Sequence, residues 1–195
     1  NIVSGGKLVV GNGSYANAPD YDPNNAVYQG ETTVDLSKGH ITGTGTLEVQ
    51  GTAILTDSVL DDFVQADVSN TTTQGGKVVL SGGTLELGSS NINNPVNLSN
   101  YHISANSTSR NDVDILLSGN GDDVIKGENV VIDKAFDSSV KDKLNIEADN
   151  LTLGDASATN VGALNFKQAT VSKQIDFKSG DPIENRVVLS NKVVV

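Results

Sequence analysis

The chain has 195 residues, 36% of them hydrophobic, and a formal net charge of −11. Nucleic acids and anionic membrane surfaces both require clustered Lys and Arg, so this charge disfavours both as partners. The chain contains no Cys, which excludes disulfides, a thiol nucleophile and Cys-ligated metals. Because Met is absent too, we expect Asn1 to begin an excised or processed piece of a larger secreted chain. No apolar stretch approaches the ~20 residues that span a bilayer, so we expect no membrane insertion.

The first element in chain order is a short strand within residues 5–11, between glycine corners. Residues 12–31 are polar, contain two prolines and predict a long loop. Three tyrosines of this loop, Tyr15, Tyr21 and Tyr28, are candidate binding contacts. The alternative is that they pack the loop against the rest of the protein.

Short alternating strands with glycine turns are predicted between residues 34 and 55. Residues 56–67 differ, because apolar residues recur there at helical spacing. Thr56 is a candidate N-cap, and Asp57 lies in the first turn. The apolar positions are Val59, Leu60, Phe63 and Val64. We therefore predict a short amphipathic helix. Phe136, Val140 and Leu144 have the same four-residue spacing and predict a second helical turn.

A short β-run recurs about every 15–25 residues, with Gly, Asn or Asp beside it. The runs are 77–80, 96–98, 114–117, 129–132, 150–153 and 186–189. In parallel coils, the inward residues of successive turns lie about 4.8 Å apart and stack into aliphatic ladders. With ~20 residues per coil, the chain gives about eight or nine coils. We predict a single, mostly β domain over 1–195 that forms a parallel β-helix, a solenoid. The alternative is a tandem β-sandwich.

Residue counts and motifs give little support for catalysis. The two histidines, His40 and His102, have no nucleophile signature beside them and are predicted to be surface residues. Adjacent acidic pairs occur at Asp61–Asp62 and Asp122–Asp123, and carboxylate pairs can perform the acid–base chemistry of polysaccharide cleavage. We predict no catalytic residue and no enzyme, and keep a polysaccharide hydrolase or lyase as an alternative.

Residues 118–127 resemble one copy of the calcium-binding nonapeptide of RTX proteins. The candidate calcium ligands are Asn120, Asp122 and Asp123. In that family the ligands come from tandem copies, whereas this chain has a single one. A tight corner between two strands explains the same residues without a metal. Calcium is therefore a possible cofactor, and no other cofactor is expected.

The phrases at 82–88 and 149–154 resemble passenger and exoprotein segments of Gram-negative type V secretion. This class includes autotransporter passengers and filamentous-haemagglutinin-like adhesins. The resemblance implies a right-handed parallel β-helix, an extracellular or bacterial cell-surface location and a structural and adhesive role. Expected partners are a host-cell surface, a matrix protein, a glycan or another copy. The expected contact loops are 12–31, 66–75 and 105–112. A weaker resemblance to RTX-type S-layer proteins implies calcium-dependent self-assembly instead.

Overall fold

A computed structural model describes most of the protein. The described residues are 1–11, 33–65, 75–88, 95–106, 113–118, 123–134, 136–140, 143–153, 163–171 and 187–194, with the backbone alone from residue 153 onward. Within these ranges the protein is mostly β-strand and has one α-helix. The prediction of a mostly β protein with a short helix is confirmed.

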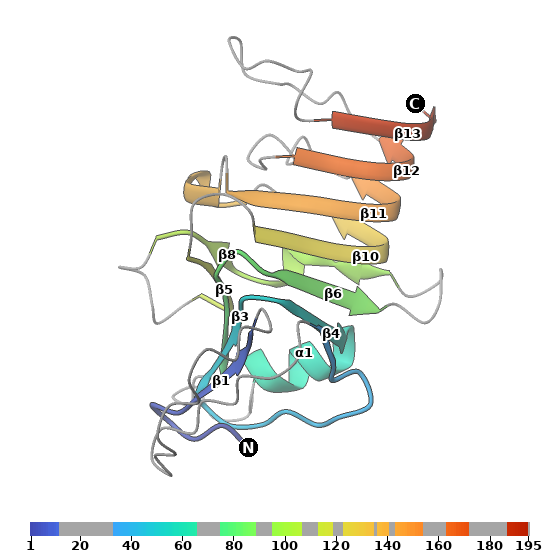
Figure 1. The fold of residues 1–195 in the computed structure, drawn as a ribbon. Helices are drawn as coiled ribbons and strands as arrows, with labels where there is room; N and C mark the ends of the chain where they lie inside the picture. Colours follow the sequence, from blue (N-terminus) through green and yellow to red (C-terminus); the bar gives the residue numbers. More distant parts are fainter. Residues whose placement is uncertain are drawn as a thin grey trace.

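The described strands form two sheets (Figure 1). The five-stranded sheet has the order β1 (Lys7–Val10), β3 (Thr46–Val49), β5 (Lys77–Leu80), β9 (Ile115–Leu117) and β8 (Ile103–Ser104). The eight-stranded sheet has the order β13 (Val187–Val194), β12 (Ala163–Val171), β11 (Leu144–Leu153), β10 (Asp123–Ile132), β6 (Thr84–Gly88), β4 (Thr52–Thr56) and β2 (Thr33–Asp35), and β7 (Val96–Asn97) pairs with β10.

Every strand pair that the structure describes is parallel. β10 to β13 lie one above another along the stack, with the N-terminal strands at its lower end (Figure 1). A tandem β-sandwich requires antiparallel pairs, so the described sheets do not support that alternative. Parallel sheets are confirmed, and the winding into a right-handed β-helix stays a prediction.

The core is a set of aliphatic ladders that run across the strands. One ladder joins Leu47, Val78 and Ile115 in the five-stranded sheet, and all three are fully buried. A second ladder in the eight-stranded sheet contains Ala53, Leu85, Ile125 and Ile146. Because side chains alternate along a strand, in-register pairing places apolar residues of successive strands in contact.

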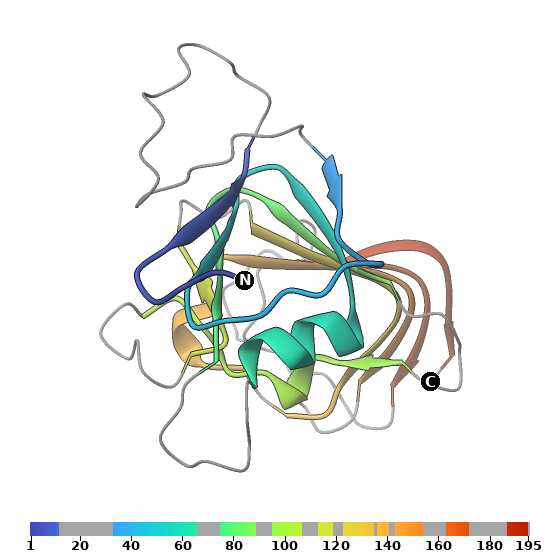
Figure 2. The same cartoon turned by 90° about the horizontal axis from the view of Figure 1, so that it is seen from below.

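The predicted helix is present as α1, Asp57–Val64. The Thr56 side chain caps it by accepting a hydrogen bond from the Val59 N–H at 3.2 Å. Its apolar face packs against β4 and β5 and is buried in the core. Seen along the stack, the two sheets leave one side uncovered, and α1 lies on that side (Figure 2).

The second predicted helical turn is shorter than expected. A 3₁₀ turn, η3, covers Ser138–Val140, and Leu144 already begins β11. Phe136, Val140 and Leu144 are nevertheless all buried in the same core. Their spacing indicates burial correctly but gives the wrong extent of helix. A further 3₁₀ turn, η1, covers Leu98–Asn100.

Candidate functional site

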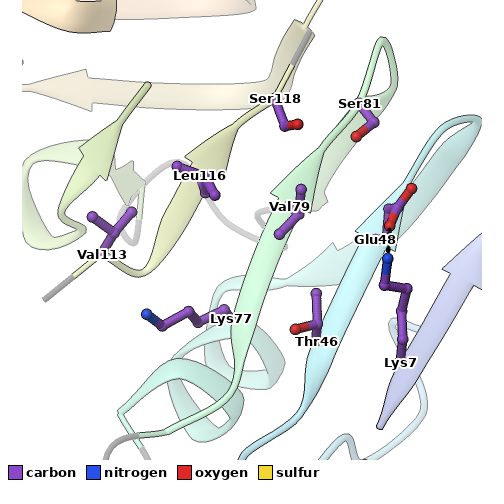
Figure 3. A pocket seen from close by; sticks show the side chains of 9 residues that line it. All are labelled: Lys7, Thr46, Glu48, Lys77, Val79, Ser81, Val113, Leu116 and Ser118. Atoms are coloured by element: carbon purple, nitrogen blue, oxygen red, sulfur yellow. Dashed lines mark hydrogen bonds and ion pairs between the residues drawn. The ribbon is translucent and has the colours of Figure 1, made fainter. Parts of the chain in front are cut away.

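The outer face of the five-stranded sheet is hollowed into a groove of about 410 Å³ (Figure 3). It is lined by side chains of β1, β3, β5 and β9 and by residues that flank β5 and β9. They are Lys7, Thr46, Glu48, Lys77, Val79, Ser81, Val113, Leu116 and Ser118. We call this feature the sheet groove.

Alternation along the strands places these side chains on the outer face. In β3, Leu47 and Val49 are fully buried in the core, whereas Thr46 and Glu48 line the sheet groove. Register then aligns the outer residues across strands, so that Glu48 lies beside Val79 and Val79 beside Leu116. The sheet groove is therefore lined by outward residues that are aligned across neighbouring strands.

An ion pair lies at the β1–β3 side of the sheet groove. Lys7 Nζ lies 2.6 Å from Glu48 Oε2, and Gln50 Nε2 donates to Glu48 Oε1 at 2.6 Å. Desolvation, the largest single influence, raises the pKa of Glu48. The hydrogen bonds from Lys7 and Gln50 outweigh it and hold this pKa below its ordinary value of 4.5. Glu48 is thus ionised, and both of its oxygens are engaged.

Apolar side chains form the β5–β9 side. Val113 and Leu116 are 3% and 8% exposed, yet neither belongs to the core cluster between the sheets. Val79 lies beside Leu116 in the next strand. Parallel strands with apolar residues on both faces are ordinarily covered on both faces. Val113 and Leu116 are therefore buried, and the partly exposed Val79 is the apolar side chain that this side presents beside the ion pair and the hydroxyls.

The described lining of the sheet groove carries few titratable side chains. It has one carboxylate, Glu48, no histidine, and hydroxyls from Thr46, Ser81 and Ser118. Within the described part of the chain, no group of three or more His, Cys, Asp or Glu residues could hold a metal ion. The arrangement can donate and accept hydrogen bonds beside an apolar patch.

Most of the predicted site residues lie outside the described ranges. Tyr15, Tyr21 and Tyr28 do so with loop 12–31, and so do the candidate calcium ligands Asn120 and Asp122. The same is true of residues 66–74 and 107–112, which form most of the other two predicted contact loops. Their binding roles stay predictions.

Asp123 is the one predicted calcium ligand that the structure describes. It begins β10 and is fully buried. Its Oδ1 accepts a hydrogen bond from the Gly82 N–H at 2.8 Å. Gly82 adopts a positive φ of 73° in the turn between β5 and β6. The Asp123 carboxylate thus stabilises the turn between β5 and β6, and the calcium and metal-free interpretations of the motif both stay predictions.

Both histidines are exposed, as predicted. His40 Nδ1 lies 3.7 Å from Asp62 Oδ2, an exposed pair, while the His102 backbone N–H donates to Asp114 Oδ2 at 2.7 Å. The structure separates the Asp61–Asp62 pair, because Asp62 is exposed and Asp61 contacts the buried Tyr101. No acid–base pair arises from these two neighbours.

The sheet groove was not predicted from the sequence. A signal was available in the runs 77–80 and 114–117, where apolar residues occupy consecutive positions instead of alternating. Such a run places an apolar residue on each face of the sheet, and the outward residues here are Val79 and Leu116.

No protein-family model, curated protein or solved structure matches the chain significantly. Among the helices that the structure describes, none has the length and apolarity to cross a membrane.

Proposed function

We propose that the chain is a right-handed parallel β-helical segment of an exported bacterial surface protein, with a structural and adhesive role. The observation that supports it best is the continuous parallel register from β4 through β6, β10 and β11, which stacks one buried aliphatic ladder. A stack of this kind forms a stiff spacer, because each turn contacts its neighbours along the axis.

The pairing of β10 supports helical winding. Its first part, Val124–Gly127, pairs with β6, and its second part, Val130 and Val131, pairs with β7. β6 and β7 are thus two successive strands of one turn, and β10 is a single strand of the next turn that pairs with both of them. Asn150 Nδ2 donates to Asn129 Oδ1 at 2.9 Å, and these residues are 21 apart. That separation agrees with the ~20 residues per coil expected of a β-helix.

The sheet groove is the contact surface that we assign to the adhesive role. A volume near 410 Å³ falls in the range of small-ligand sites. Hydroxyls and an ion pair beside the partly exposed Val79 match a saccharide unit, which presents hydroxyls at its edge and C–H groups on its face. The resemblance to type V secreted adhesins and the absence of Cys support an extracellular location and a host glycan or matrix partner.

A solid-phase binding assay tests this proposal. The probes are an array of neutral, sialylated and sulfated oligosaccharides, and collagen-coated wells. The groove variant combines Lys7→Gln with Glu48→Gln. The matched control combines Lys126→Gln with Glu86→Gln. These two residues form an ion pair in the eight-stranded sheet, with 3.5 Å between Nζ and Oε2. Both double variants remove one positive and one negative charge.

We expect the wild type to bind some of the probes and the groove variant to lose about tenfold in affinity, ~1.4 kcal/mol. The control should stay within about twofold. Absence of binding to every probe would contradict the adhesive role, and equal loss in both variants would exclude the sheet groove. Calcium-dependent assembly would favour the S-layer alternative, and release of reducing sugars would favour a hydrolase or lyase.

A further inference from the structure

Three oxygen-bearing side chains meet where α1 contacts the segment that follows η1. The Tyr101 hydroxyl lies 2.6 Å from Asp57 Oδ1 and 2.6 Å from Asp61 Oδ1. Tyr101 is 5% exposed and belongs to the core cluster. The contact joins residues that are 44 and 40 positions apart, so it ties α1 to a later part of the chain.

The two short contacts of the Tyr101 hydroxyl indicate whether one of the carboxyl groups carries a proton. A phenol has one hydrogen and can donate it to only one carboxylate. The second oxygen–oxygen contact is equally short and needs a hydrogen of its own. A protonated carboxyl that donates to the phenol oxygen supplies such a hydrogen.

The helix adds a second reason for proton uptake. Asp57 and Asp61 are four residues apart in α1 and therefore lie on one face of the helix. Two carboxylates at this spacing repel each other when both are ionised. A proton on one of them removes the repulsion and supplies the missing hydrogen.

We propose that Asp57, Tyr101 and Asp61 form a proton-binding site that fastens α1 to the segment after η1. The folded chain holds one proton between the two carboxyl groups at pH values where free carboxyl groups are ionised. Loss of this proton leaves two carboxylates facing one hydroxyl hydrogen and weakens the attachment of α1. This site is independent of the adhesive role.

The pKa directions agree with this geometry. Burial raises the pKa of Asp57, which the nearby Asp61 charge also raises, against a hydrogen bond from Tyr101 that lowers it. Burial, followed by the two carboxylate contacts, raises the pKa of the Tyr101 hydroxyl far above its ordinary value. The hydroxyl therefore keeps its hydrogen across the ordinary pH range.

Other charged groups face the cluster from the elements around it. Asp114 lies close enough to Asp61 to interact with its charge, and burial raises the pKa of Asp114. Lys77, on β5, and His102, beside Tyr101, act in the opposite direction on Asp114. Asp62, on the outer side of α1, pairs with His40.

The sign of the pH dependence follows from the raised pKa of Asp57. A carboxyl with a raised pKa in the folded state contributes stability that is fully present below the pKa of the unfolded chain, ordinarily 3.8, and is lost as the pH rises through the folded value. Asp114 acts in the same direction, whereas the lowered pKa values of Asp35, Glu48 and Asp137 act in the opposite one. A comparison of variants therefore isolates the cluster.

The test measures Tm from about pH 4 to about pH 8 for the wild type, Asp61→Asn, Asp57→Asn and Asp62→Asn. An amide at position 61 or 57 provides the N–H that a protonated carboxyl would supply. We expect Asp61→Asn to raise Tm by about 2–4 °C at the upper pH and to have little effect at the lower one. Asp57→Asn should follow the same trend with a smaller gain, because Asp57 also interacts with the N-terminus of α1. The exposed control, Asp62→Asn, should change Tm by the same small amount at every pH.

Parallel Tm profiles for Asp61→Asn and the wild type would overturn the proposal. A ¹³C-carboxyl NMR titration of the unmodified chain tests it without any variant. We expect the Asp57 carboxyl to titrate above its ordinary value of 3.8, because burial raises its pKa. Titration of the Asp57 carboxyl at or below that value would also overturn the proposal.

Discussion

Leu85 has no exposed surface and lies between Ala53 and Ile125 of the neighbouring strands. Truncation of such a side chain removes apolar burial and leaves a cavity that flanking rungs cannot fill without a shift of register. We predict that Leu85→Ala lowers the free energy of unfolding by about 2–5 kcal/mol in a denaturant titration. Val3 is 65% exposed, so the control Val3→Ala should change it by no more than about 0.5 kcal/mol. Equal effects of the two substitutions would contradict the assignment of the core.

At the residue scale, the sequence predicts burial better than it predicts contacts. The burial of Val59, Leu60, Phe63 and Val64 follows from their spacing in the helix. The contact between Tyr101 and α1 does not follow from local spacing, because it depends on how later parts of the chain are aligned with α1. Only the folded register brings residues more than 40 positions apart to 2.6 Å.

At the element scale, α1 depends on its N-cap. Thr56 Oγ1 accepts the Val59 N–H, which would otherwise lack an intrahelical partner. We predict that Thr56→Ala lowers the free energy of unfolding by about 1 kcal/mol, whereas Thr56→Ser, which keeps the hydroxyl, stays close to the wild type. Helical circular dichroism and denaturant midpoints measure the effect. An equal loss in both variants would show that the threonine methyl group, and not the cap, stabilises this end of α1.

The helix and the parallel strands were predicted from local and repeating signals, whereas the sheet groove, which depends on exact register, was not. The cap residue and the apolar spacing of α1 lie within nine residues of chain, so sequence alone locates the helix. The sheet groove requires β1, β3, β5 and β9, whose register no local pattern determines. The short turn η3 also shows the limit, because buried residues four apart favour a helix even where the next strand begins.

At the scale of the whole molecule, parallel pairing joins all the strands of each described sheet. The register that places buried residues of successive strands in contact also aligns the outward residues that line the sheet groove. Composition correctly indicated a mainly aliphatic core, but surface contacts depend on detail that composition does not contain.

Distances between spin labels along one ladder test the continuous parallel stack most directly. Ile54, Glu86, Lys126, Glu147, Asn165 and Val188 are successive register partners. The chain has no Cys, so a label at Ile54→Cys can be paired with one at Glu147→Cys, Asn165→Cys or Val188→Cys without removing native thiols. At about 4.8 Å per strand, we predict mean label distances near ~14, ~19 and ~24 Å by electron paramagnetic resonance. Distances that fail to increase in this order, or that do not rise by about one strand spacing at each step, would contradict the stack.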